Sequence, residues 1–142
     1  MVFSDFFRRL AFFAGRDTAG MRAEDLDFAG WVAVHRDWRQ RLVDFIAGSS
    51  QERLDERRVC QDHLCELGRW IHGSGGRFYG DVDIFRDVRA KHAVFHHCAG
   101  EVVRRYKSEG EVAARRLLES EFDRASIQVV MGLEALERKV KG

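Results

Sequence analysis

EVAARRLLESEFDRASIQVVMGLEALERKV, residues 111–140, is a stretch whose apolar residues return at intervals of mostly three and four. This is the spacing that lets one face of a helix pack against neighbouring helices. The apolar seam consists of Leu118, Phe122, Ala125, Val129, Leu133, Leu136 and Val140. Neither this stretch nor the rest of the 142-residue chain contains a proline. Because proline breaks helices, its absence favours long, uninterrupted ones.

Three further helices are predicted before this one, over residues about 26–46, about 52–71, and from Asp81 or Asp83 to Tyr106. The connections between them are short and rich in turn residues: GSS at 48–50, GSGG at 73–76 and SEG at 108–110. Short connections place successive helices antiparallel. The sequence therefore predicts an all-α fold, an antiparallel four-helix bundle over residues 23–142.

The N-terminal residues 1–22 are predicted to form a short amphipathic helix followed by a linker. Apolar residues recur at helical spacing between positions 3 and 14, namely Phe3, Phe6, Phe7, Leu10 and Phe13. Such a helix is expected to pack against the main body or against a partner chain.

Charge and hydropathy limit the classes of partner. The chain has 24 basic and 23 acidic residues, a net charge of +1, which gives no reason to expect nucleic acid or an anionic membrane. No stretch approaches the roughly 18 apolar residues of a transmembrane helix. Arg8 and Arg9 before LAFFAG faintly resemble a twin-arginine signal, but nearby charges shorten the apolar region. We therefore expect a mature, cytoplasmic protein.

Four residues are candidate metal ligands. His92 and His96, in HAVFH, lie four positions apart and share one helix face, although such a pair alone is weak evidence. His35 precedes the turn at Ser49 by fourteen residues and Cys65 follows it by sixteen, so an antiparallel pair of helices would hold them at the same height. The histidine pair of the next helix falls at that height too. Three helices are thus expected to bring four ligands together.

Zinc is the metal that this donor set favours. Zn²⁺ prefers tetrahedral nitrogen and sulfur donors, and three imidazoles with one thiolate supply four. A complete shell favours a structural or sensory site with one ion per chain over a hydrolytic enzyme. The fourth helix offers Phe122, Ala125 and Ser126 at this height, which close the site without a ligand. Binding should weaken as the pH falls, because the thiol must lose its proton.

Other residues near the predicted ligands are given structural roles. Trp38 and Trp70 are expected to pack around the site, and Gly68 to permit a close helix approach. Cys60 and Cys98 are interpreted as small buried hydrophobic residues, with a resolving thiol for oxidised Cys65 as the lesser alternative.

The remaining histidines, His63, His72 and His97, are interpreted as surface or partly buried residues outside the ligand set. On a continuous helix His63 would point away from Cys65, and His72 would lie two turns from it.

Taken together, the motifs resemble the chemoreceptor zinc-binding domain, the CZB family. The motifs are His35 with Trp38 in HRDWR, Cys65 in CELGRW, and HAVFH, and the ligand intervals of 30, 27 and 4 residues are similar to the family's. The resemblance covers residues about 28–105. By this correspondence the zinc ligands are His35, Cys65, His92 and His96.

The resemblance also implies a function. CZB domains are helical zinc sensors attached to bacterial chemoreceptors or diguanylate cyclases, and they are often dimeric. The family's zinc-bound cysteine is linked to sensing of metal availability or of oxidants such as hypochlorous acid. Because this chain carries no signalling domain of its own, a free-standing homodimer that acts on a separate signalling protein is expected.

Two alternatives stay open at this stage. One is a hemerythrin-like di-iron bundle that binds oxygen, although di-iron sites need bridging carboxylates. The other is a passive, zinc-stapled dimerisation or adaptor module, since the seam of residues 118–140 and the Phe-rich N-terminus supply much apolar surface.

Overall fold

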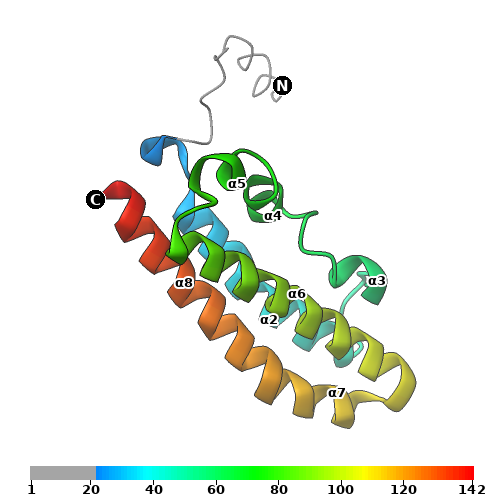
Figure 1. Ribbon diagram of the computed structural model, residues 1–142. Helices are drawn as coiled ribbons and strands as arrows, with labels where there is room; N and C mark the ends of the chain where they lie inside the picture. The colour runs from blue at the N-terminus through cyan, green and yellow to red at the C-terminus, as the bar shows by residue number, and fades with distance from the viewer. Residues whose placement is uncertain (1–21) are drawn as a thin grey trace.

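Three long helical rods form the body of the protein in the computed structural model, which describes residues 22–142 (Figure 1). The predicted N-terminal helix and most of its linker lie outside the described residues. The rods are α2 (Phe28–Ile46), α6 (Asp83–Glu109) and the continuous succession of α7 (Glu111–Leu117), the π-helix η2 (Leu118–Phe122) and α8 (Asp123–Lys141). The short 3₁₀ helix η1 (Ala23–Asp25) precedes them. The predicted all-α bundle is confirmed, and the described residues contain no strand.

The second predicted helix, over residues 52–71, is wrong as a continuous rod. In its place the chain forms three short helices, α3 (Glu56–Val59), α4 (Glu66–Ile71) and α5 (Ser74–Tyr79), which lie along one side of the rods (Figure 1). Asp55 caps α3 through a bond from the Arg57 amide, and Cys65 caps α4 through a bond from the Gly68 amide. Because both cap residues have extended backbones, the helix is interrupted at each of them.

The glycine-rich segment after residue 71 also differs from the prediction. Gly75 and Gly76 lie inside α5 rather than in a turn. A β-carbon at Gly75 would come within 2.6 Å of the Trp70 ring, so the absence of a side chain is what lets α4 and α5 pack together. Close packing therefore outweighs the low helix propensity of glycine here.

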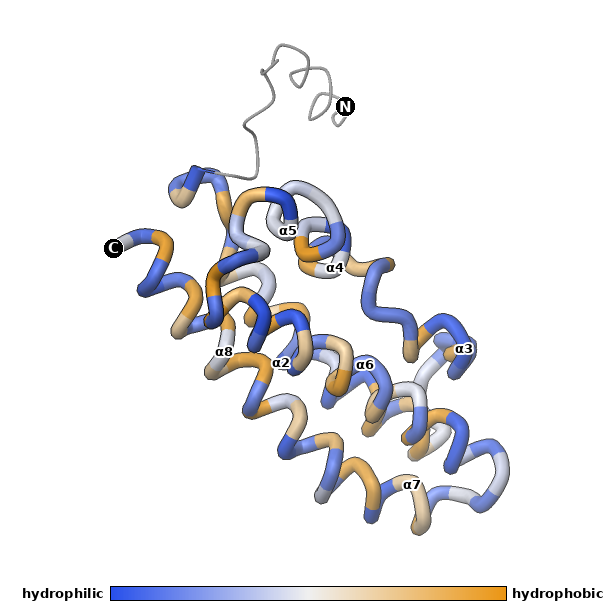
Figure 2. Tube along the Cα trace, viewed as in Figure 1, coloured by the Kyte–Doolittle hydropathy of each residue, from blue (hydrophilic) through white to orange (hydrophobic). Residues whose placement is uncertain are grey.

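The predicted seam of the C-terminal rod faces the core. Six of its seven residues are buried, and Val140, near the chain end, is partly buried. Hydrophobic and hydrophilic residues alternate along each long helix in the manner of amphipathic helices (Figure 2). Gly110, with φ +95°, joins α6 to α7 where the sequence predicted a tight connection. Within residues 22–142, every helix is too short or too polar to cross a lipid bilayer.

The core has two separate apolar clusters. One surrounds Trp38 and Phe95 toward the α3 and α7 end, and the other surrounds Trp31 and Val88 toward η1 and the C-terminal end of α8. His35 lies between the two tryptophans on α2, and the buried His92 separates Val88 from Phe95 on α6. A buried polar layer therefore divides the two halves of the core.

Candidate metal centre

The buried layer brings together one donor atom from each of four residues, His35, Cys65, His92 and His96, all within 4.8 Å of one another. The Nε2 atoms of His35 and His92 are 3.1 Å apart. The Cys65 Sγ atom lies 3.3 Å from Nε2 of His92, 3.7 Å from that of His96 and 3.9 Å from that of His35. These are the four residues that the sequence analysis selected as ligands.

The distances suit a tetrahedral ion. With Zn–N of about 2.0–2.1 Å and Zn–S of about 2.3 Å, tetrahedral geometry separates two nitrogens by about 3.3 Å and a sulfur from a nitrogen by about 3.6 Å. The measured separations of 3.1 Å and 3.3–3.9 Å lie around these values. The three imidazole rings have centroids 4.6–5.6 Å apart, close to the roughly 5 Å expected for rings on one zinc.

Backbone carbonyl groups fix the proton positions of two imidazoles. His35 Nδ1 lies 2.7 Å from the carbonyl oxygen of Trp31, and His96 Nδ1 lies 3.0 Å from that of Val59. A carbonyl oxygen only accepts, so each Nδ1 must carry the proton and donate. In the neutral rings, both Nε2 atoms therefore keep their lone pairs and point them into the cluster.

His92 is held differently. Its side chain is fully buried, and its Nδ1 has no hydrogen-bond partner among the described residues. A buried polar atom without a partner is costly. The His92 ring is thus oriented by what lies at its other nitrogen, Nε2, which faces His35 and the Cys65 sulfur. That arrangement fits a metal ion at Nε2.

Burial keeps the imidazoles neutral and the thiol protonated when no metal is bound. Desolvation lowers the pKa of His35 to about 4 and that of His92 to about 2, and it also lowers the pKa of His96. It raises the pKa of the half-buried Cys65 thiol. The site therefore offers three lone pairs at neutral pH, and a metal must displace the thiol proton to gain the fourth ligand.

Cys65 occupies the N-cap of α4 rather than a helix interior. Its sulfur accepts a hydrogen bond from the Gly68 amide at 3.3 Å. A β-carbon at Gly68 would overlap the backbone carbonyl oxygen of Asp62, so glycine permits the loop before Cys65 to cross closely over α4. The segment that approaches Gly68 closely is the loop before Cys65, whereas a neighbouring helix was predicted there.

The match to known families lies on this part of the chain. Residues 35–103 match the family described as chemoreceptor zinc-binding domain. The match begins at His35 and includes Cys65, His92 and His96. Residues 35–103 are a CZB domain. CZB domains are zinc-binding sensory domains and not a known catalytic family. No curated protein and no solved structure matches the chain.

The CZB domain holds His96 by a close approach of α3 to α6. A β-carbon at Gly100, one turn after His96, would come within 2.7 Å of the Cys60 β-carbon. Because Gly100 leaves this space open, the end of α3 reaches α6, and the Val59 carbonyl can accept the bond from His96.

Aromatic side chains wall the cluster on one side. The centroid of the Trp38 ring lies 6.5 Å from that of the His96 ring. Phe95 is fully buried, and its ring lies 5.0 Å from His35 and 5.2 Å from His96. Phe95 was not among the predicted site residues, although its place inside HAVFH was a usable signal. Trp70 packs in the apolar cluster of Trp31 and Val88, with its ring centroid 5.1 Å from that of Trp31.

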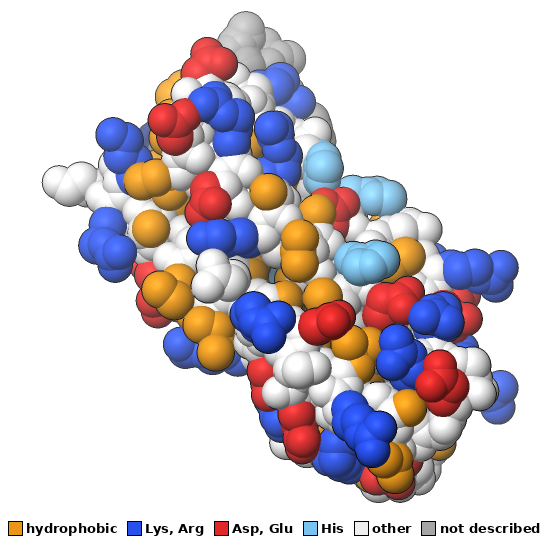
Figure 3. Space-filling view, turned by 60° about the horizontal axis from the view of Figure 1, so that its bottom comes forward, with side chains coloured by type: hydrophobic (Ala, Val, Ile, Leu, Met, Phe, Trp, Pro, Cys, Tyr) orange, Lys and Arg blue, Asp and Glu red, His pale blue; other side chains and the backbone are white. Residues whose placement is uncertain are grey.

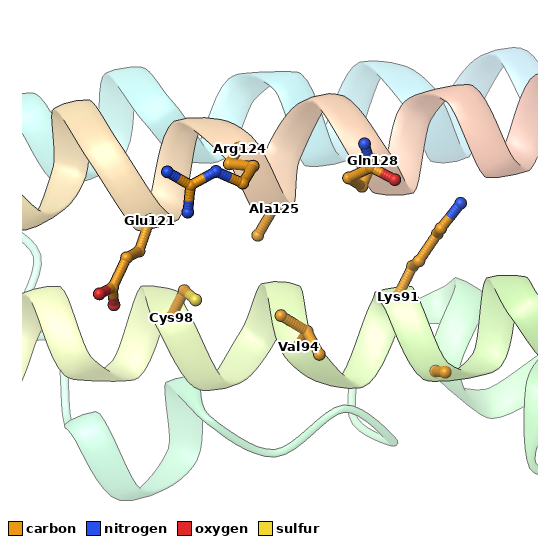
Figure 4. A pocket seen from close by; sticks show the side chains of 8 residues that line it. Lys91, Val94, Cys98, Glu121, Arg124, Ala125 and Gln128 are labelled. Atoms are coloured by element: carbon orange, nitrogen blue, oxygen red, sulfur yellow. The ribbon is translucent and has the colours of Figure 1, made fainter.

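The remaining cysteines lie apart from the cluster. Cys98 is buried, and it lines a groove between α6 and the rod of α7, η2 and α8, beside Val94 and Ala125 (Figure 4). Cys60 is exposed, so its assignment as a buried hydrophobic residue is wrong. It follows the single turn of α3, whose inner side is taken by Val59.

The remaining histidines, His63, His72 and His97, are exposed, which confirms their expected place at the surface.

Proposed function

We propose that this CZB domain binds one Zn²⁺ per chain through Nε2 of His35, His92 and His96 and through the Cys65 thiolate. The observation that carries the proposal is the convergence of these four buried or half-buried donors at tetrahedral spacing. Four protein ligands leave no position for a substrate or a reactive water. We therefore assign the site a regulatory rather than a catalytic role.

The regulatory role is that of a sensor whose surface changes with zinc. Three ligands stand on the long helices α2 and α6, whereas Cys65 stands on the segment of short helices. Loss of zinc would loosen that segment around Cys65, while the long helices and the buried Leu67 and Ile71 of α4 stay packed in the apolar core. A cytoplasmic signalling protein, such as a chemoreceptor or a component of a diguanylate cyclase pathway, would respond to the change. We expect the domain to act as a homodimer.

Oxidation of Cys65 is the second stimulus that we propose. Its sulfur is half-buried, so a small oxidant can reach it. Hypochlorous acid would oxidise the thiolate to a sulfenic acid and be reduced to chloride, and the neutral product would release zinc.

The test of the metal site is metal content by mass spectrometry on the purified chain and two cysteine variants. We expect one zinc per wild-type chain, a strong loss in Cys65→Ala, and no loss in the matched control Cys98→Ala. One equivalent of hypochlorite should release zinc from the wild type, and Cys65→Ser should blunt this response. Wild-type protein without zinc, or equal zinc content in Cys65→Ala and wild type, would overturn the assignment.

The two alternatives make different predictions. The group of candidate ligands in the described part of the chain contains no carboxylate, so it lacks the bridging ligands of a di-iron site. A di-iron protein would be coloured, whereas zinc protein is colourless. For a passive staple, self-association and partner binding would have equal affinity with and without zinc. For a sensor, they would differ.

A further inference from the structure

Metal exchange with the buried cluster has to pass on the side of Cys65. The side chains of His35, His92 and His96 are at most 3% exposed, whereas Cys65 is half-buried. The approach to the ion from solvent therefore lies over the chain segment that carries Cys65.

Two exposed histidines and an aspartate lie close together on that segment. The ring centroids of His63 and His72 are 6.4 Å apart, and both side chains are exposed. Nε2 of His72 lies 3.3 Å from a carboxylate oxygen of Asp62. Figure 3 shows histidine side chains gathered on one face of the molecule.

This group lies next to the buried cluster. The backbone of Asp62 and His63 crosses closely over Gly68. The amide of Gly68 donates a hydrogen bond to the Cys65 sulfur. His72 caps the other end of the same six-residue helix, α4.

We propose that His63 and His72 form a weak surface zinc site that delivers zinc to the cluster and receives it on release. Asp62 is a positioning residue: by accepting the Nε2 proton of His72, it leaves the lone pair on Nδ1. Two imidazoles on one zinc lie about 5 Å apart, so exposed side chains need to close the 6.4 Å separation by about 1 Å.

Two ligands with water bind zinc more weakly than four buried ones, so the ion would pass inward to the cluster. The proposal rests on zinc binding at the buried cluster.

The experiment compares rates with affinities, using Zn²⁺ alone as the probe. Stopped-flow mixing of metal-free protein with zinc would follow uptake by the fluorescence of Trp38, which lies beside His96. Mixing of zinc-loaded protein with a chelator would follow release. For the double variant His63→Ala/His72→Ala we expect both rates to fall by about tenfold, which corresponds to about 1.4 kcal/mol in activation free energy. The equilibrium affinity should stay within about twofold, since a transfer site changes both directions equally.

The control is His97→Ala, which removes the third exposed histidine, and its rates should equal those of the wild type. Unchanged rates in the double variant would overturn the proposal, as would a change in affinity that accounts for the change in rate. Equal slowing in His97→Ala would also overturn it, because the effect would then belong to the surface in general. If the wild type binds no zinc at equilibrium, the proposed function fails first and this proposal with it.

Discussion

Replacing Phe95 with leucine should weaken zinc binding by more than the loss of fold stability explains. Phe95 is fully buried and packs its ring against His35 and His96 at 5.0 and 5.2 Å, and against Phe122 at 5.2 Å. The smaller side chain leaves the two imidazoles less constrained. Loss of such orienting contacts weakens metal affinity by about 10–100-fold. We expect about tenfold, because the backbone carbonyls still hold both rings.

The matched control is Phe85→Leu on the same helix. Phe85 is also fully buried, but it packs against Trp70 in the other apolar cluster. Each variant should lower the free energy of unfolding of the metal-free protein by about 1–2 kcal/mol. Chemical unfolding measures this loss, and competition with a chelator measures the zinc affinity. Equal zinc affinities in the two variants would refute the role assigned to Phe95.

Three further predictions concern pH, close packing and the surface. Metal-free protein should lose stability in chemical unfolding as the pH falls from about 6.5 toward 4, by up to about 1.4 kcal/mol per pH unit for each buried imidazole. Stability falls with pH because burial lowers the pKa of His35 and His92 in the folded state, so protons bind preferentially to the unfolded chain. A metal-free protein whose stability does not fall in acid would contradict this. Gly68→Ala should displace the loop over α4 and weaken zinc binding by at least about tenfold, which chelator competition would show. Arg39→Ala, which removes an exposed ion pair with Asp123, should cost at most about 1 kcal/mol in unfolding and leave zinc affinity unchanged.

The long helices could be predicted from the sequence because each carries an uninterrupted apolar period. The seam from Leu118 to Leu136 identified the C-terminal rod, and its residues are buried as expected. The π-helix within it, Leu118–Phe122, was not predicted. A single turn with i→i+5 hydrogen bonds leaves the spacing of the apolar residues nearly unchanged.

The segmented region between α2 and α6 could not be predicted from local pattern. Residues 52–71 contain no proline, and glycine only at Gly68, so helix propensity favours one rod. Capping by the side chains of Asp55 and Cys65, and the close crossing at Gly68, interrupt it. The caps are local hydrogen bonds that compete with a continuous helix. The crossing at Gly68 is a tertiary contact, which exists only where the neighbouring segment is in place.

The convergence of the four candidate donors could nevertheless be predicted, for a reason that does not depend on the helix assignment. His35, His92 and His96 stand on helices that the sequence does predict, and the turn near Ser49 brings the following segment back along α2. Cys65 therefore lies level with His35 along the axis of α2, whether the segment between them is a continuous helix or is partly extended. The prediction of a continuous helix did not include two hydrogen bonds of the site. One runs from the Gly68 amide to the Cys65 sulfur, and the other from His96 Nδ1 to the Val59 carbonyl oxygen.

The division of the core into two apolar clusters explains how a metal could act as a switch without unfolding the protein. Each cluster buries large side chains on α2, α6 and the C-terminal rod, so the three rods hold together without help from the polar layer. The polar layer itself joins those rods to the Cys65 segment, whose helices have only four to six residues. Isolated helices of that length are unstable in water. Their order therefore depends on tertiary contacts, which are the apolar packing of Val59, Leu67 and Ile71 and the position of Cys65 at the cluster. The proposed Cys65–zinc bond at the start of α4 would thus act on the segment of short helices rather than on the long rods.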